Sequence, residues 1–221
     1  MRVAFVGPPG VGKSTQAQRL AGAFPYYNPR ISSGELVRAH IEADTEVGRR
    51  LKACYDRGER VPDAEMLPLV LPRVRRMHGW ILDNFPATVA QARALDAELG
   101  ELGLSRVISL EGPTDEELIE RVLNGRVRGR TTGLVYHLVH DPPPKPEERS
   151  DPGPFEPRED DAEEAFRRHL EAHRREIGPL KEHYEARELL SVVDARLPID
   201  DIAEDVLEVL GRPDRPQYYA T

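Results

Sequence analysis

A segment near the amino terminus, GPPGVGKS at residues 7–14, constrains the fold more than any other part of the chain. It matches the phosphate-binding pattern G-x-x-x-x-G-K-[ST] at every position. An apolar run at residues 3–6 precedes it, and a stretch with helical periodicity at residues 13–23 follows. The pattern needs this order, because the backbone N–H groups of the loop and the amino terminus of the helix surround a phosphate together. The segment therefore predicts a nucleoside triphosphate site.

The residue types in this loop indicate how the phosphates are held. Lys13 can reach the β- and γ-phosphate oxygens, and the Ser14 hydroxyl can ligate Mg²⁺. Asp83 ends another apolar run, and ligands of open parallel sheets bind beyond the carboxyl ends of the strands. We expect Asp83 to be the second contact to Mg²⁺, direct or through water; the alternative is that it only caps the next turn. The loop residues predicted to bind ATP are Gly10, Val11, Gly12, Lys13, Ser14 and Thr15.

Further apolar runs at residues 80–82, 107–110 and 189–193 alternate with helical patterns. Strands that are hydrophobic almost throughout indicate a parallel sheet covered by helices on both faces. The sequence therefore predicts an α/β fold with a three-layer P-loop core.

Two stretches interrupt this alternation. Residues 33–77 read as successive helices with no convincing strand, and residues 126–159 are crowded with proline. A proline-rich stretch of this length inside a compact protein is either disordered or a functional lid. A long helix is expected from residue 160 to about 187, and we expect the paired acids Asp160 and Asp161 to cap it. The alternative is a role in lid hinging or a salt bridge to the arginines.

Composition narrows the class of protein. Of 221 residues, 31 are Lys or Arg and 39 are Asp or Glu, which gives a net charge of −8. Such a field repels nucleic acid, so we expect no nucleic-acid partner and a local positive cluster for any polyanionic ligand. No apolar run approaches the roughly 18 residues that span a bilayer. With Cys54 as the single cysteine, these features predict a cytoplasmic protein without membrane contact.

Taken together, the motifs resemble those of the adenylate kinases in order and in rough spacing, from residue 1 to about residue 210. That family moves a phosphoryl group reversibly between Mg·ATP and AMP. The segments that carry the resemblance are residues 7–15, 31–38, 82–86, 125–126, 135–137, 141–145 and 158–161.

The resemblance implies a domain organisation and a set of partners. The P-loop core would comprise residues 1–32, 78–124 and 161–210, with an NMP-binding helical insertion at 33–77, a lid at 125–160 and a flexible tail at 211–221. The partners would be the nucleotides ATP, AMP and ADP, and the cofactor Mg²⁺ with ATP. The lid lacks the four cysteines of zinc-bearing relatives, so no structural zinc is expected. Members with this type of lid act as monomers.

The resemblance also implies roles for individual residues. Arg126 and Arg158 would close on the phosphates as catalytic groups beside Lys13, and Val135 and Tyr136 would help enclose ATP. Arginine suits this task because its planar guanidinium is permanently charged and binds phosphate through two parallel hydrogen bonds. Arg38 would bind the AMP phosphate and Gln91 the adenine edge. The implied AMP-binding residues are Ser33, Arg38, Val61, Asn84, Gln91, Arg158 and His169.

Several positions depart from the family pattern. Family members usually carry Asp-Gly-Phe-Pro-Arg where this chain has Asp-Asn-Phe-Pro-Ala at residues 83–87, so Ala87 replaces an expected AMP-phosphate arginine. His169 and Val122 also stand where arginines are expected. Arg93, Arg121 and Arg168 are nearby substitutes in the sequence. Two alternatives to an AMP kinase therefore stay open: a kinase for another nucleoside monophosphate, and a catalytically weak relative that binds ATP.

Overall fold

The computed structural model describes residues 1–24, 28–56, 59–145, 148, 150–157 and 161–211. Its centre is a five-stranded sheet in the order β2-β3-β1-β4-β8 with every pair of neighbours parallel, which confirms the predicted α/β P-loop class. The strands are β1 (Arg2–Val6), β2 (Arg30–Ser32), β3 (Trp80–Asp83), β4 (Arg106–Glu111) and β8 (Leu190–Asp194). Strand β2 was not predicted, because three residues are too few to show a periodicity.

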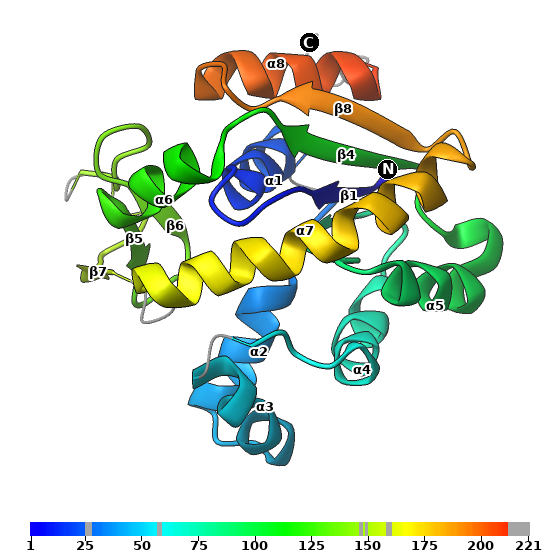
Figure 1. The fold of residues 1–221 in the computed structure, drawn as a ribbon, viewed down its shortest axis with the longest axis horizontal. Helices are drawn as coiled ribbons and strands as arrows, with labels where there is room; N and C mark the ends of the chain where they lie inside the picture. The colour runs from blue at the N-terminus through cyan, green and yellow to red at the C-terminus, as the bar shows by residue number, and fades with distance from the viewer. Residues whose placement is uncertain (25–27, 57–58, 146–147, 149, 158–160, 212–221) are drawn as a thin grey trace, which may run out of the picture.

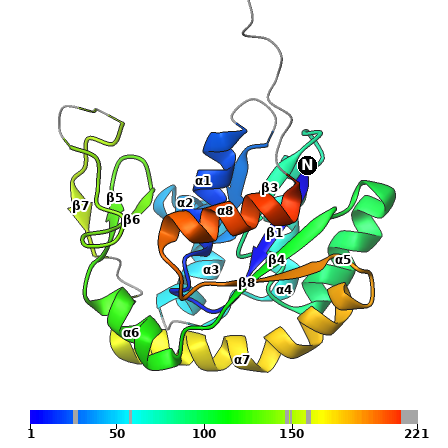
Figure 2. The same ribbon diagram turned by 90° about the horizontal axis from the view of Figure 1, so that it is seen from above.

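Helices cover both faces of this sheet (Figures 1 and 2). In β1, Val3 and Phe5 point into a core shared with α1 (Lys13–Ala23) and α8 (Ile199–Leu210). Ala4 and Val6 point the other way, into a core shared with α5 (Val89–Leu99). The long helix α7 (Glu163–Glu185) contributes side chains to both cores. Each central strand is thus buried on both faces, which accounts for its nearly continuous apolar sequence.

The described residues between 33 and 77 are mostly helical, as the sequence predicts. They form α2 (Ser33–Glu42), α3 (Glu46–Asp56) and α4 (Asp63–Val74), and Figure 1 shows α2 and α3 projecting away from the central sheet. Between β4 and the second insertion, α6 (Asp115–Leu123) packs on α7, and a short 3₁₀ turn, η1 (Gly100–Leu102), follows α5. The domain boundaries stay a prediction, and residues 212–221 of the predicted tail lie outside the described residues.

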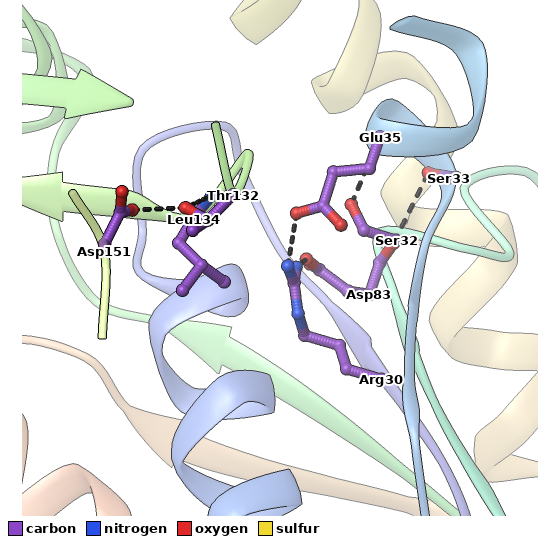
Figure 3. A network of polar contacts seen from close by, with 8 residues as sticks. All are labelled: Arg30, Ser32, Ser33, Glu35, Asp83, Thr132, Leu134 and Asp151. Atoms are coloured by element: carbon purple, nitrogen blue, oxygen red, sulfur yellow. Dashed lines mark hydrogen bonds and ion pairs between the residues drawn. The ribbon is translucent and has the colours of Figure 1, made fainter. Parts of the chain in front are cut away.

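The proline-rich insertion contains a small antiparallel sheet in the order β6-β5-β7, with β5 (Arg126–Gly129), β6 (Val135–His137) and β7 (Phe155–Glu156). The buried carboxylate of Asp151 holds it together by accepting a hydrogen bond from the Thr132 hydroxyl (Figure 3). It also accepts one from the Gly153 backbone N–H, at 3.0 Å. A Cβ atom on Gly129 would lie 2.0 Å from an Asp151 carboxylate oxygen. Only glycine fits at position 129 beside this carboxylate.

None of the helices in the described part of the chain is both long enough and apolar enough to cross a membrane.

Two helical glycines give opposite predictions for stability. A Cβ on Gly48 would lie 1.9 Å from the His40 backbone oxygen, whereas one on Gly22 would meet nothing within 4 Å. Gly48→Ala should therefore lower the free energy of unfolding by about 1–3 kcal/mol through overpacking. Gly22→Ala should raise it by about 0.5–1 kcal/mol, because alanine favours a helix over glycine. Urea unfolding of both variants measures the difference, and equal effects would contradict the packing of α3 against α2.

Candidate active site

A cavity of about 870 Å³ lies at the carboxyl ends of the central strands. The glycine-rich loop, the helical segment at residues 33–77 and the small β5-β6 sheet all contribute to its wall. All of the predicted site residues that the structure describes line this cavity: Gly10, Val11, Gly12, Lys13, Ser14, Thr15, Ser33, Arg38, Val61, Asp83, Asn84, Gln91, Arg126, Val135, Tyr136 and His169. Arg158 lies outside the described residues.

The glycine-rich loop presents its lysine to the cavity. Gly12 caps α1 with a backbone φ of +103°, a left-handed conformation that favours glycine. The buried Lys13 ammonium donates hydrogen bonds to the backbone oxygens of Gly7 and Pro8, each at 2.8 Å. Burial lowers the pKa of Lys13 to about 8; Asp83 opposes this shift and Arg126 adds to it. A partly desolvated ammonium is therefore poised beside the space that phosphates would occupy.

Asp83 ends β3 at the floor of the cavity, and Arg30 of β2 fixes its carboxylate. One Asp83 oxygen accepts a hydrogen bond from Arg30 at 2.6 Å, and Arg30 also pairs with Glu35 (Figure 3). Burial alone would lower the pKa of Arg30, but Asp83 and Glu35 outweigh it and hold the pKa above its ordinary value. The other Asp83 oxygen is buried and has no hydrogen-bond donor among the described residues. A carboxylate oxygen of this kind fits a magnesium ion, and the Ser14 hydroxyl lines the same cavity.

The loop after β3 and the start of α2 form another part of the wall. The Ser33 hydroxyl donates to the Asn84 backbone oxygen at 3.0 Å, while Ser32 caps α2 by accepting from the Glu35 N–H. Asn84 has a φ of +62°. Asparagine tolerates this left-handed backbone better than most residues, so it can occupy a position where the family usually has glycine. Arg38, on α2, is buried at the cavity wall.

Gln91 is held rigidly by its neighbours. Its side-chain oxygen accepts from the Ala87 N–H at 2.7 Å, and its side-chain nitrogen donates to Asp63 at 2.7 Å. The Thr88 hydroxyl donates to the same Asp63 carboxylate at 2.8 Å. An amide can donate two hydrogen bonds and accept two. In these contacts one N–H and one lone pair of Gln91 are used, which leaves one of each for a ligand.

On the side of the small sheet, Arg126 pairs with the buried Asp161 through two parallel hydrogen bonds and lies 5.6 Å from the centre of the Phe166 ring. The expectation that Asp161 caps the long helix is wrong: Ala162 occupies the N-cap position of α7 without a side-chain hydrogen bond. The salt bridge, named as the alternative, is what forms. The guanidinium attracts this carboxylate more strongly than the helix end does because it carries a full charge. Asp160 lies outside the described residues.

The two insertions also touch each other. Arg128 of β5 pairs with Glu42 of α2 at 3.0 Å. On β6, burial raises the pKa of Tyr136 to about 12, and the charge of Asp151 adds to the shift. Tyr136 therefore stays protonated at neutral pH. Of these two interactions, the Arg128–Glu42 ion pair is the one that links the small sheet to the helical segment.

The structure shows where the side chains lie at two of the positions that depart from the family pattern, and where the nearby arginines lie. Val122 is buried and packs beside Gly10, so it contributes an apolar group and no charge to the cavity wall. His169 lines the cavity, as does Arg121. Arg168 is exposed and pairs with Glu164. Of the three nearby substitutes, only Arg121 reaches the cavity wall, because Arg93 is exposed outside it.

The charged or titratable residues of the cavity wall that the sequence did not single out include Arg60 and His173. Neither belongs to a recognisable motif. Arg60 follows α3 at a distance of 27 residues from Ala87, to whose backbone oxygen it donates a hydrogen bond. A contact between segments this far apart in the chain leaves no local signal in the sequence.

Comparison with known proteins gives a consistent result. A family model described as adenylate kinase matches residues 5–189. Adenylate kinase from Caldicellulosiruptor bescii is 38% identical over 218 residues, which cover 96% of this chain and 99% of that protein. Adenylate kinase from Thermodesulfovibrio yellowstonii is 39% identical over 96% of this chain and 100% of that protein. Adenylate kinase from Streptomyces coelicolor is 37% identical over 96% of this chain and 99% of that protein.

The lowered pKa of Lys13 predicts a pH dependence of nucleotide binding. Below about pH 8 the free protein carries an ammonium at this position, and above it a neutral amine. The affinity for Mg·ATP should therefore fall as the pH rises through 8, by up to about tenfold per pH unit. Titration with a fluorescent ATP analogue from pH 6.5 to 9.5 measures this. Lys13→Arg is the control, because a guanidinium does not lose its proton in this range; an equally steep fall in that variant would contradict the assignment.

The Arg30–Asp83 pair predicts that substitutions of these two residues have non-additive effects on the free energy of unfolding. Arg30→Gln would leave the buried Asp83 carboxylate without its counter-ion and should lower the free energy of unfolding by about 3 kcal/mol. Adding Asp83→Asn removes that uncompensated charge, so the double variant should recover most of the loss. Denaturant unfolding of wild type, the two single variants and the double variant gives the four free energies of unfolding of a double-mutant cycle. Additive effects would show that the two side chains do not depend on each other.

Proposed function

The chain belongs to the adenylate kinase family, and on that basis we propose that it catalyses the reversible transfer of a phosphoryl group from Mg·ATP to AMP, giving two ADP. The observation that carries the proposal is the convergence on one cavity of a phosphate-binding loop, a buried arginine on α2 and an oriented glutamine after β3. The first suits the donor nucleotide, and the other two suit the phosphate and the base of the acceptor.

For phosphoryl transfer the protein mainly has to position the two substrates and to supply positive charge. In phosphoryl transfer, negative charge is spread over the equatorial oxygens of the transferred group, and enzymes accelerate it by aligning the two substrates and stabilising that charge. We assign this task to Lys13, Arg126 and Arg158. The Arg126 guanidinium is already oriented by Asp161, so little conformational entropy is lost when it contacts a phosphate. Direct in-line transfer needs no covalent intermediate.

Magnesium fits the donor side of the site. Ser14 and Asp83 would hold the ion, directly or through water, and the ion would offset the charge of the ATP phosphates. Arg30 fixes the Asp83 carboxylate in place, so that its second oxygen keeps one orientation. The Lys13 ammonium is oriented by the Gly7 and Pro8 oxygens before a phosphate arrives.

Gln91 supports adenine as the acceptor base. Its remaining N–H and lone pair supply one donor and one acceptor, the types that pair with the N7 acceptor and the N6 amino donor of adenine. Guanine presents two acceptors, N7 and O6, on the same edge, so its O6 would face the Gln91 oxygen. We assign Val61 and Asn84 to the same acceptor subsite, and Val135 and Tyr136 to the enclosure of ATP. The relatives' names favour neither another acceptor nor a non-catalytic binding role.

The family resemblance also supports a monomer in the cytoplasm, with nucleotides as the only partners. In a monomer the water that competes with AMP has to be excluded by the chain itself. The ion pair between Arg128 and Glu42 links the two insertions, and we assign the exclusion of this water to their closure over the substrates.

The decisive measurement is phosphoryl transfer from Mg·ATP to AMP, GMP, CMP and UMP in parallel, with a blank that contains no acceptor. We expect ADP formation with AMP at least about tenfold faster than with the other three, because we assign Gln91 to the adenine edge. Lys13→Ala should abolish transfer to AMP while the protein stays folded. Equal rates with all four acceptors would contradict the role of Gln91, and full activity of Lys13→Ala would contradict the ATP site.

A further inference from the structure

One basic side chain at the acceptor end of the cavity has no part in the assignments above. Arg60 follows α3, and its guanidinium donates a hydrogen bond to the Ala87 backbone oxygen at 3.1 Å. Arg60, Ala87 and Gln91 all line the cavity. The guanidinium therefore reaches from the helical segment across to the loop that orients Gln91, and its anchor there is a neutral carbonyl group.

The charge of Arg60 is poorly compensated. Burial lowers its pKa, and Glu176 and Asp63 act against this only from a distance. Within the described part of the chain, no carboxylate forms an ion pair with Arg60, whereas Arg126 pairs with Asp161. Removing a cation from water without a counter-ion costs free energy that an anionic ligand can restore. A desolvated guanidinium at the wall of a nucleotide-sized cavity thus points to an anion.

The opposite wall supports this interpretation. His173 of α7 lines the cavity, and burial lowers its pKa to about 3, with the charges of Lys13 and Arg60 adding to the shift. Both cations therefore act on the same imidazole, which is neutral at physiological pH. Lys13 lies at the donor end and Arg60 at the acceptor end of a common space. His173 adds no charge to this space.

We propose that Arg60 binds the phosphate group of the acceptor nucleotide together with Arg38. A guanidinium has five N–H donors, and the bond to Ala87 uses one of them. The others can form a bidentate contact with phosphate while the anchor to the loop remains. The identity of the acceptor rests on the proposed function, but the contact itself involves only the phosphate that every nucleoside monophosphate carries.

Binding of AMP and of adenosine, which lacks the phosphate, tests this role. Arg60→Gln removes the charge but keeps an N–H that can bond to the Ala87 oxygen, and Arg60→Lys keeps the charge. By isothermal titration calorimetry we expect Arg60→Gln to weaken AMP binding about 10- to 100-fold and to leave adenosine binding within about twofold of wild type. Arg60→Lys should keep AMP binding closer to wild type than Arg60→Gln does. Arg76→Gln is the matched control, since Arg76 is exposed and outside the cavity wall, and it should change neither affinity.

Two results would overturn the proposal. Equal weakening of AMP and adenosine by Arg60→Gln would show that Arg60 only supports the base pocket, and unchanged AMP affinity would show that it only braces the loop. Wild-type protein is measured first with AMP, GMP, CMP and UMP. If it binds one of the others instead of AMP, the proposed acceptor is wrong, and the same comparison with that nucleotide and its nucleoside still tests Arg60. Thermal unfolding confirms that each variant is folded, and Arg60→Lys provides the test if Arg60→Gln is not.

Discussion

Several cations line one cavity in a chain whose net charge is −8, and much of the structure follows from how they are held there. Like charges repel more strongly when water is excluded. Three of these cations are held by different hydrogen-bond acceptors. Lys13 donates to two backbone oxygens, Arg126 to the Asp161 carboxylate, and Arg60 to a single backbone carbonyl group. These acceptors also differ in how much of the positive charge they offset. Lys13 and Arg60 are held by neutral carbonyl groups, whereas Arg126 is held by a carboxylate that offsets part of its charge.

The parts of the site that could be predicted from the sequence are those in which function constrains neighbouring residues. The phosphate-binding loop needs its glycines, lysine and serine at fixed spacing, and Asp83 needs only to end a buried strand. The α/β core could be predicted for a similar reason, because strands buried on both faces are continuously apolar. The small sheet at β5, β6 and β7 was missed because its strands are two to four residues long and lie among prolines.

What the sequence could not provide is the set of contacts between distant segments. Arg30 and Asp83 are 53 positions apart, and Arg126 and Asp161 are 35 apart. No local pattern favours Asp161 pairing with an arginine over capping its own helix, since an acidic residue suits both roles. The same limit applies to the missing arginines. Ala87 and Val122 look like losses in the sequence, but Arg60 reaches the loop at Ala87, and Val122 belongs to the core.

The contact between Gly129 and Asp151 has a consequence for how this lid can change over evolutionary time. A side chain at position 129 would have to occupy the space of the Asp151 carboxylate, and that carboxylate orders the turn through Thr132 and Gly153. Neither residue can be replaced alone without a clash or an unfilled, unpaired group. The two positions are therefore bound to vary together. A lineage that changed one of these two residues would have to pass through a poorly folded intermediate or change both residues at once.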